Sequence, residues 1–535
     1  MNNREQVVEA YERLGGNVSA AARELGLARS TVYHHLAAAG IQIDKPIAEG
    51  RINERDIDKM PLPKKGQIAR YILTSAQNNT KVNAKVWESL VVLANHYEAL
   101  IFVGTFTYNM NRYGQLSVKR GTQKEKQSEL WYDPNVVVHL YDNRVELAPG
   151  LHWCGEMNIL PTAIDPLCGF ETYTGTASGI FPHAKFAMRS VPSGSKYESA
   201  KMNYTTGCVT QRNYVAKKSG LRAEHHHGYG GLVVEVDHYG NWWVRQLNAT
   251  DDGEIHDLTI MVKDGKVVEN ERVEAISWGD VHVARLDPLV NAAAWDEGGM
   301  LDALKPKYQF IHDIMLGIVT NHWESQNPHE RFRRYCKGGQ WSSLSAEIRG
   351  AVDFLKRIKR NWCETIVVDS NHDRPWIERW LRETDGRNDP RNVVLWLKLQ
   401  LALYEEIQKC PDHRDFNILA YALKMEGLPD KHAEFLKRDA SFPITKAKIE
   451  CGMHGHLGPN GARGNASNLR RLGRKANIGH THDAGIWDGL YVAGISCTKD
   501  LGYNEGPSSW SHSHIVTYTN GKRAIVTMRD NRWRA

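Results

Sequence analysis

The sequence lacks the features that mark membrane-spanning, secreted and disulfide-rich proteins. None of its apolar runs reaches the roughly 18–20 residues that a membrane helix needs. Its eight cysteines are dispersed and include no CxxC pair, so we expect buried or free thiols rather than a disulfide frame or a zinc ribbon. The first residues, MNNREQVVEAYERL, have the pattern of an amphipathic helix and not of a signal peptide. These absences predict a cytoplasmic protein without a membrane partner.

What is present is the composition of a soluble globular protein, with 41% hydrophobic and 24% charged residues. A chain of 535 residues is long enough for about two to four domains. The net charge of +6 is compatible with a polyanionic partner but does not demand one.

The segment 1–42 has the pattern of a three-helix DNA-binding domain. Helices are expected over 4–14, 19–25 and 30–39. The last two have helix-turn-helix spacing, with the small Ala22 for close packing, Gly26 in the turn and Val32 in the core. The segment AARELGLARSTVYHHL resembles the helix-turn-helix of bacterial regulators and resolvase-like proteins. The residues expected to contact DNA from the recognition helix are Arg29, Ser30, Thr31, Tyr33 and His34. The alternative is a small helical packing or oligomerisation unit.

Residues 43–65 contain KP and LPKKG without a clear period, which predicts a linker. Residues 66–272 are expected to form a mixed α/β domain, with a helix over 82–97. The expected strands lie in ALIFVGTFTYN, NVVVHLYD, LVVEVDHYGNWWVRQL and LTIMVKDGKVVE, the last with a hairpin turn at Asp264-Gly265. The internal tract His225-His226-His227 could bind metal, but we interpret it as a solvated loop cluster.

The second half of the chain carries an ordered series of residues that commonly bind metals. Its five elements are Asp280 and His282 in DVH, Asp313, Asn371-His372-Asp373, His454 and His456 in HGH, and His480 and His482 in GHTH. Oxygen and nitrogen atoms of Asp, Asn and His suit hard-to-borderline divalent metals, and no thiolate accompanies them. Any one element would mean little among 24 histidines, but five in this order indicate one site.

Several elements follow directly on strand-like runs. The run 273–279 ends at Asp280, and alternate residues of an extended chain point the same way, so Asp280 and His282 can converge on one ion. The β-branched run 365–368 leads into Asn371-His372-Asp373. Glycines beside the later histidines allow the backbone to come close to a metal cluster.

The series resembles the signature of the calcineurin-like metallophosphoesterase superfamily, which runs DxH, GDxxD, GNH(D/E), H and GHxH. Within it, the nuclease branch is nearest, with SbcD-type exonucleases and the phage pre-early nucleases that degrade host DNA as analogues. The resemblance implies a four-layer α/β/β/α sandwich over residues 273–535. It also implies two ligand sets: Asp280, His282 and His482 for a first ion, Asn371, His454 and His480 for a second, and Asp313 as the bridge.

Two elements depart from the signature. His312-Asp313 stands where the family has Gly-Asp, and Leu316 stands where its second Asp would be. Ser370 replaces the glycine of the third element. Asp302 is the alternative carboxylate for the second element, and His456 is the alternative imidazole for the fourth.

The resemblance implies two-metal chemistry. Two divalent ions about 3.5–4 Å apart can lower the pKa of a shared water and hold the attacking and leaving oxygens of a phosphodiester. Mn²⁺ is the expected ion, and Mg²⁺, Fe²⁺ or Zn²⁺ suit the same ligands. His372 would stabilise the charged transition state or protonate the leaving oxygen, and Asp373 would orient His372.

Two basic groups lie beside the metal-ligand elements. The first, expected to contact the DNA backbone, comprises Arg463, Arg470, Arg471 and Arg474. The second, after the second element, comprises Arg331, Arg333, Arg334 and Lys337. The alternative for both is a solvated charged surface.

An insertion near residues 375–445 separates the third element from the fourth. Residues 391–440, which include RNVVLWLKLQLALYEEIQ and KHAEFLKR, have helical periodicity. We interpret the insertion as a helical cap or as the surface of a homo-oligomer of at least two chains.

These features predict an α/β multidomain protein: an all-α helix-turn-helix, a central mixed α/β domain and the C-terminal metallophosphoesterase sandwich. The leading hypothesis is a two-metal DNase, an exonuclease in phage-type DNA degradation within the host cytoplasm. The alternatives are a phosphatase or small-molecule phosphodiesterase, and a DNA-binding regulator with a vestigial metal fold.

Overall fold

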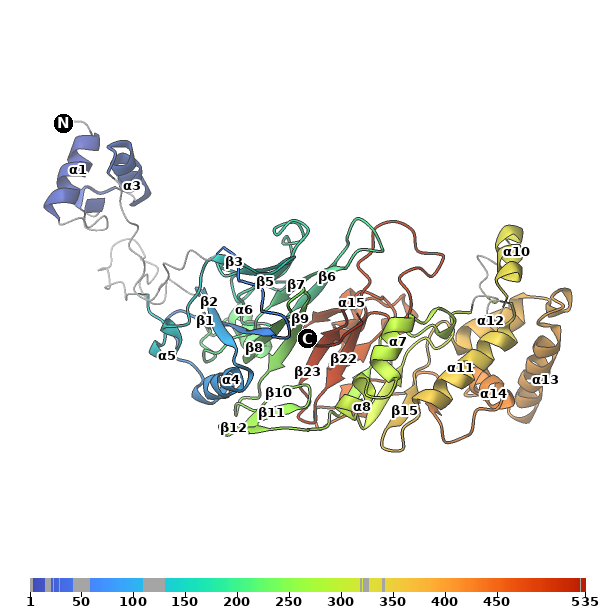
Figure 1. Cartoon of the computed structure of the whole chain (residues 1–535). Helices are drawn as coiled ribbons and strands as arrows, with labels where there is room; N and C mark the ends of the chain where they lie inside the picture. The colour runs from blue at the N-terminus through green and yellow to red at the C-terminus, as the bar shows by residue number, and fades with distance from the viewer. Residues whose placement is uncertain are drawn as a thin grey trace. The chain divides into compact units, whose positions relative to one another are not determined.

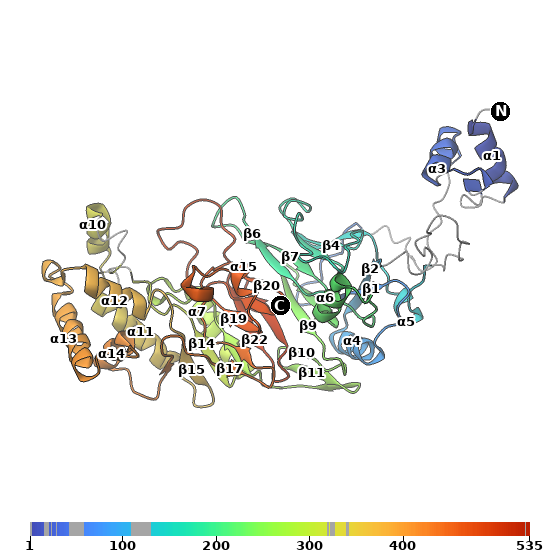
Figure 2. The same ribbon diagram turned by 180° about the vertical axis from the view of Figure 1, so that it is seen from behind.

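The computed structural model describes residues 3–14, 21–22, 24–27, 29–41, 58–108, 130–317, 320, 327–338, 342–412, 414–529 and 531–535. The chain divides into two compact units, Met1–Ile52 and Asn53–Ala535. Figures 1 and 2 show their helices and strands from opposite sides. Across the described ranges, no helix combines the length and the apolar character that crossing a membrane requires. The expected linker 43–65 is described only from residue 58 onwards.

The first unit has the expected helical organisation. It contains α1 (Asn3–Arg13) and α3 (Arg29–Ala38), and the described residues 21, 22 and 24 between them are helical. One apolar core is formed by Val7, Ala10, Ala21, Ala22, Val32 and Leu36. Gly26 has a φ of 65°, a left-handed conformation that glycine adopts readily, and it makes the turn before α3. The helices predicted over 4–14 and 30–39, the turn and the core anchors are confirmed. Of the helix predicted over 19–25, residues 19, 20 and 23 lie outside the described residues.

The second unit is built around a six-stranded sheet of order β16-β15-β14-β13-β22-β23. Four strands run parallel: β13 (Ala275–Ser277), β14 (Tyr308–Ile311), β15 (Glu364–Val367) and β16 (Glu434–Phe435). The antiparallel pair β22 (Ser513–Thr517) and β23 (Arg523–Thr527) extends the sheet beyond β13. The carboxyl ends of the parallel strands therefore lie along one edge, which is where open α/β sheets bind ligands.

Helices cover one face of this sheet. Ile276, Ile311 and Val367 of the strands share a core with Leu355 and Trp380 of the helices. The helices of this part are α7 (Pro288–Trp295), α8 (Met300–Leu304), α10 (Pro328–Lys337), α11 (Leu344–Ile358), α12 (Arg374–Glu383), α13 (Val393–Lys409) and α14 (Ile418–Met425), with single turns at Val283–Arg285 and Gly386–Asn388. Both views show α11 to α14 grouped beside β15. The expected helical insertion is confirmed by α12, α13 and α14.

The opposite face of the six-stranded sheet packs against a second sheet. Ala275, Phe310 and Ile366 alternate with the helix-facing residues and contact Ile449 and Cys451 of that sheet. Its order is β17-β18-β19-β21-β20-β6-β7-β5-β4-β3. The first five strands are β17 (Pro443–Ile444), β18 (Ile449–Glu450), β19 (Ala476–Ile478), β21 (Leu490–Val492) and β20 (Gly485–Trp487). The short helix α15 (Ala466–Leu469) covers part of its outer face, after a single turn at Pro459–Gly461.

The other five strands of this sheet come from the middle of the chain. They are β3 (Arg144–Ala148), β4 (Leu151–Cys154), β5 (Ser178–Phe181), β6 (Met188–Val191) and β7 (Lys201–Thr205). The junction is the antiparallel pair β20–β6, in which Ile486 lies opposite Met188. Segments 66–272 and 273–535, expected as separate domains, therefore share a sheet within one compact unit. The pairing covers what would otherwise be an open edge on β20.

A four-stranded sheet, β2-β1-β8-β9, completes the middle of the chain. Its strands are β1 (Ala69–Gln77), β2 (Leu100–Phe106), β8 (Gly230–Val236) and β9 (Trp242–Asn248), with α4 (Ala84–Tyr97) on one face. A small sheet follows, with β10 (Ile255–Asp257), β11 (Ile260–Lys263) and β12 (Lys266–Val268). The predicted helix over 82–97 and the Asp264-Gly265 hairpin turn are confirmed.

Three local predictions are wrong. NVVVHLYD begins with the helix α5 (Pro134–Val137), because Asp133 caps the Asn135 amide and Pro134 favours a first helical turn. KHAEFLKR contains β16, which pairs with β15 and so overrides the helical pattern. His225-His226-His227 is not a solvated loop: it ends α6 (Lys218–His226), and His227 is buried against the hydroxyl of Tyr214.

Candidate metal centre

The predicted ligands follow strands whose carboxyl ends meet at one place. Asp280 and His282 follow β13, Asp313 follows β14, Asn371 follows β15, His454 follows β18, and His480 and His482 follow β19. The first three strands are parallel neighbours in one sheet, and β18 and β19 are parallel neighbours in the facing sheet. This topology brings residues from distant parts of the sequence together between the two sheets.

Four of these residues form a compact buried group. The ligand atoms of Asp280, His282, Asp313 and His482 all lie within 4.8 Å of one another. Nε2 of His482 is 3.0 Å from Oδ2 of Asp280, and Nε2 of His282 is 3.9 Å from Oδ2 of Asp313. This group could hold a metal ion.

The orientation of His282 fits a metal ligand. Its Nδ1 lies 2.9 Å from the carbonyl oxygen of Met315, whereas its Nε2 is buried without a hydrogen-bond partner in the described structure. A buried polar atom without a partner is unfavourable. A metal-binding histidine commonly has this arrangement, with one ring nitrogen held by a carbonyl and the other free for the ion.

A second group adjoins the first. Oδ1 of Asn371 is 2.9 Å from Nε2 of His454 and 3.0 Å from Nδ1 of His480. Nε2 of His454 is also 3.2 Å from Oδ2 of Asp313. The same Asp313 oxygen therefore faces an imidazole of each group.

Four residues of the two groups have an unusual backbone conformation. His282, Asp313, His480 and His482 have φ values of 42°, 43°, 72° and 63°. Residues other than glycine rarely adopt this left-handed region, and it concentrates at functional sites. At the neighbouring Gly479, a Cβ atom would overlap Oδ1 of Asp280, so a side chain there would displace that carboxylate.

Burial sets the protonation of the group. It raises the pKa of Asp280 to about 6 and lowers the pKa of His282 to about 3 and that of His480 to about 4. Burial alone would also raise the pKa of Asp313, but the neighbouring His454 and His372 hold it well below its usual value. Neutral imidazoles beside a charged carboxylate are the state that a metal requires of its ligands.

His372 is held at the edge of the group by three contacts. Its backbone N–H donates to Oδ1 of Asp313 at 3.1 Å. Its Nδ1 lies 3.0 Å from the carbonyl oxygen of Leu316. Its ring stacks on Trp376, with centroids 4.5 Å apart and an interplanar angle of 16°. The ring plane and one ring nitrogen are thereby fixed.

Asp373, which was expected to orient His372, contacts the loop beside His372. Its buried carboxylate accepts hydrogen bonds from the amides of Met315 at 2.9 Å and Ile314 at 3.4 Å. It therefore holds the loop whose next carbonyl, that of Leu316, contacts His372. Burial and the charge of Asp313 raise the pKa of Asp373 well above its usual value.

Sequence reasoning missed two residues that support this loop. Glu347, on α11, accepts hydrogen bonds from the amides of Leu316 at 2.7 Å and Gly317 at 2.8 Å. Trp376, on α12, supplies the stacking surface under His372. The buried Glu347 was detectable in principle, because it is an acidic residue among the apolar residues on the buried face of α11.

Asp302 and His456, the alternative ligands for the second and fourth elements, have different surroundings. Asp302 forms an ion pair with Arg360 at 2.7 Å and does not belong to the buried group. His456 is half-buried, with its ring centroid 5.5 Å from that of His454. His312, at the position of the signature glycine, is buried with Nδ1 3.4 Å from Nδ1 of His454.

Some residues of the predicted basic groups are exposed, and others are buried or form ion pairs. Arg463 and Arg471 are exposed, and a bridge between Leu457 and Arg463 places Arg463 beside the HGH segment. Arg470 is half-buried. Arg474 forms an ion pair with Glu450 at 2.8 Å, which occupies part of its charge. In the second group Arg334 is buried, so it is not part of a solvated surface, and the side chain of Arg331 lies outside the described residues.

The predicted DNA-contacting residues of the first unit all fall on α3. Of their side chains, the structure describes only that of Thr31, which is half-buried. The side chains of Arg29, Ser30, Tyr33 and His34 lie outside the described residues.

Comparison with known proteins identifies the first unit and gives a relative of most of the chain. Residues 4–38 match a family described as bacterial regulatory protein, Fis family. The match spans α1 to α3, identifies the first unit as a helix-turn-helix and implies DNA binding. The chain is also 37% identical over 477 residues to Protein A1 of Escherichia phage T5, covering 87% of this chain and 82% of that protein. The chain therefore belongs to the family of phage T5 Protein A1.

Proposed function

We propose that this protein is a metal-dependent deoxyribonuclease that hydrolyses DNA phosphodiester bonds at a two-metal centre of the calcineurin-like metallophosphoesterase type. One observation carries the proposal: seven predicted ligands from two facing sheets converge in one place. The layer order of helices, two facing sheets and α15 supports a four-layer α/β/β/α sandwich.

The distances support two ligand sets. Asp280, His282 and His482 would hold one ion, and Asn371, His454 and His480 the other, with Asp313 between them. The oxygen and nitrogen donors favour Mn²⁺, with Mg²⁺, Fe²⁺ or Zn²⁺ as alternatives. When bound, such a pair polarises water and neutralises phosphate charge.

His372 is the proposed acid beside the ligands. A carbonyl only accepts hydrogen bonds, so the contact with Leu316 places a proton on Nδ1. When the ring is doubly protonated, Nε2–H is the remaining donor, and it can stabilise a charged phosphate or protonate the leaving oxygen. Trp376 limits rotation of the ring, and Asp373 and Glu347 hold the loop that carries the Leu316 carbonyl.

DNA as the substrate depends on other features. The Fis-type helix-turn-helix would bind duplex DNA through Arg29, Ser30, Thr31, Tyr33 and His34. Arg463, Arg470 and Arg471 would contact the DNA backbone near the HGH segment, with Arg474 shared between DNA and Glu450. Exonuclease action in phage-type DNA degradation is the form of the activity that we propose.

The test uses the purified full chain with Mn²⁺ and four substrates: linear duplex DNA, circular duplex DNA, bis-(p-nitrophenyl) phosphate and p-nitrophenyl phosphate. We expect nucleotides to be released from linear DNA and circular DNA to resist. His372→Ala should lower the DNA rate by about 10²-fold or more. The exposed His225→Ala, on α6, is the matched control and should leave the rate unchanged. No release of nucleotides, or an unchanged rate in His372→Ala, would overturn the proposal.

The same panel separates the alternatives. A phosphatase would prefer p-nitrophenyl phosphate, and a small-molecule phosphodiesterase would prefer the bis-ester to DNA. A DNA-binding regulator with a vestigial metal fold would bind DNA but retain no metal and cleave none of the four substrates.

A further inference from the structure

A polar cavity of about 480 Å³ lies outside the candidate metal centre. Its walls are the β3–β4 turn, the start of β7, the β8–β9 turn, the segment before β22 and the end of β23. It contains none of the seven predicted metal ligands. Its volume falls within the roughly 300–1,000 Å³ of small-molecule binding sites.

The charge of the lining has one sign. Lys201, Lys499 and Arg529 line the cavity, and among the residues that the structure describes no Asp or Glu lines it. The ammonium of Lys201 donates to the carbonyl oxygens of Glu171 at 2.6 Å and Gly175 at 2.7 Å. Among the described ion pairs, neither lysine has a carboxylate partner. A buried cation is normally paired with an acid, so this lining is suited to an anion brought by a ligand.

Lys499 and Arg529 form the more accessible part of this charge. Nζ of Lys499 donates to the carbonyl oxygen of Glu198 at 2.6 Å, which uses one of its three donors. Burial and the charge of Arg529 lower the pKa of Lys499, with Asp287 acting in the opposite direction. Arg529 also lies over the ring of Trp242, 3.4 Å from its centroid. Lys499 and Arg529 thus bring two positive charges to the same cavity, and a phosphate would suit both.

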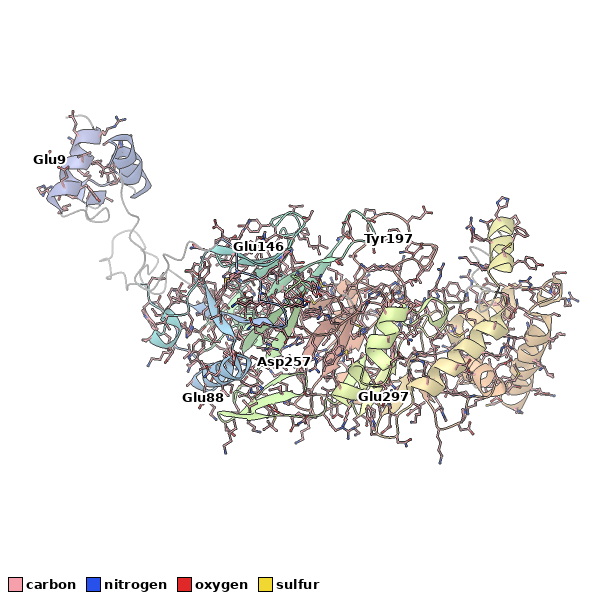
Figure 3. All side chains as sticks on the ribbon, in the orientation of Figure 1. Glu9, Glu88, Glu146, Tyr197, Asp257 and Glu297 are labelled. Carbon is pink, nitrogen blue, oxygen red and sulfur yellow. The ribbon has the colours of Figure 1, made fainter. Side chains whose placement is uncertain are left out.

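One exposed aromatic ring lines the cavity, and a second lies in the β6–β7 loop, whose residues Ser199 and Ala200 also line it. Tyr239, in the β8–β9 turn, is 73% exposed and lines the cavity. Tyr197, labelled in Figure 3, lies in the β6–β7 loop and is 72% exposed, with its hydroxyl 3.4 Å from Asp500. Cations for phosphates combined with exposed rings for bases are the chemistry by which proteins bind single-stranded nucleic acid.

Backbone pairing connects the wall of the cavity to Asp280 of the candidate metal centre. Ser511 of its wall accepts a hydrogen bond from the amide of Ile495, and Ile495 forms a parallel bridge with Asp280. Two strand spacings of about 4.8 Å separate Ser511 from Asp280, which gives roughly 10 Å. This spacing is short enough for one strand of a few nucleotides to contact both places.

We propose that this cavity binds a nucleotide of a single DNA strand, with its phosphate at Lys499 and Arg529 and its base on Tyr239. The identification of that strand as the substrate rests on the proposed function. The chemistry alone also fits a free mononucleotide, and the test below distinguishes the two sources.

The experiment measures binding of a fluorescein-labelled oligothymidylate of about eight nucleotides to the full chain in EDTA, by anisotropy at several salt concentrations. In the Lys499→Gln/Arg529→Gln double variant we expect Kd to rise at least about tenfold. The slope of log K against log salt should fall by about 1.4, because each single-strand phosphate contact contributes about 0.7. Tyr239→Ala should raise Kd at least about fivefold through lost stacking. Arg532→Gln, which removes a cation paired with Asp237 outside the lining, should match the wild type.

Equal Kd and equal salt slope in the double variant and the wild type would overturn the proposal, as would displacement of the oligonucleotide by dTMP at the same nucleotide concentration. Displacement only at much higher dTMP concentration supports a strand as the ligand. Thermal unfolding midpoints check that the variants fold. Hydrolysis of bis-(p-nitrophenyl) phosphate with Mn²⁺ should be unchanged in the double variant. A wild type that hydrolyses neither the ester nor DNA would refute the proposed function, while binding in EDTA would still decide the role of the cavity.

Discussion

At the residue scale, the candidate centre depends on conformations that most side chains avoid. His282, Asp313, His480 and His482 are left-handed, at a strain of about 1–3 kcal/mol each. Hydrogen bonds hold the strained backbone, such as that from the His282 amide to the carbonyl oxygen of Asp313 at 2.7 Å and that from the His480 amide to Asp280 at 3.0 Å. The backbone thus preorganises the candidate ligands, which would favour tight and selective metal binding.

The protonation of Asp280 predicts how metal binding depends on pH. Its pKa is about 6, so it carries a proton below pH 6 and must release it to bind an ion. His282 and His480, with pKa values of about 3 and 4, stay neutral and do not compete at that pH. Calorimetric titration of metal-free protein with Mn²⁺ should show affinity that is level above about pH 7 and falls as pH drops through 6. An affinity that is the same at pH 5 and pH 7 would contradict this assignment.

Gly479 offers a test of the geometry that leaves every ligand in place. A methyl group at this position would overlap Oδ1 of Asp280 and push the carboxylate out of position. Gly479→Ala should therefore lower bound Mn²⁺ by at least one ion per chain and abolish most DNA hydrolysis. Gly473→Ala is the matched control, because a Cβ there meets nothing within 4 Å. Metal analysis of both proteins decides: full metal content in Gly479→Ala would show that the carboxylate does not need its present position.

At the element scale, the sequence could predict the candidate ligands because they follow strand ends, which are local signals. The apolar runs before Asp280, Asp313 and Asn371 became β13, β14 and β15, and parallel pairing brought their ends together. The sequence could not reveal the pairing of β20 with β6, since contacts between distant strands leave no local pattern. The hydrogen-bond partners of Asp373 could not be predicted either, because they are backbone amides of a loop that is near in space and distant in sequence.

Helix α11 contributes to the site through Glu347. Glu347→Ala would leave the amides of Leu316 and Gly317 without their acceptor, which should destabilise the fold by about 2–3 kcal/mol. Because Leu316 contacts His372, the turnover number on DNA should also fall, while metal content stays the same. Urea unfolding, metal analysis and DNA kinetics measure the three effects. Asp353→Ala, an exposed acid on the same helix, is the control. Unchanged kinetics in Glu347→Ala would exclude a positioning role.

At the scale of the whole molecule, helix α13 predicts self-association. Val394, Leu397, Leu401 and Tyr404 are each more than half exposed and repeat at intervals of three and four residues along one face. Such a stripe suits packing against a second copy of the helix. We expect light scattering to give a mass of at least two chains for the wild type and a lower mass for Leu401→Glu. Lys398→Glu changes the charge of α13 by more than Leu401→Glu does but removes no apolar side chain, and it should associate like the wild type. A monomeric wild type would contradict the homo-oligomer.

The two compact units of the chain would have different roles. The Fis-type unit would bring the protein to DNA, and the larger unit holds the candidate centre and the cation-lined cavity. Under the proposed function, cleavage would depend on the candidate ligands of the larger unit, and Asp313 is the residue shared by both proposed metal sets.

Metal counting with a DNA assay on the wild type and Asp313→Asn tests the central claim most directly. Native mass spectrometry after Mn²⁺ loading should give two ions per wild-type chain and one or none in Asp313→Asn. Hydrolysis of linear duplex DNA by the variant should fall by about 10²-fold or more, because removing the shared carboxylate disrupts both metal sets. Two ions and undiminished hydrolysis in Asp313→Asn would contradict the account, and so would a wild type that degrades DNA without bound metal.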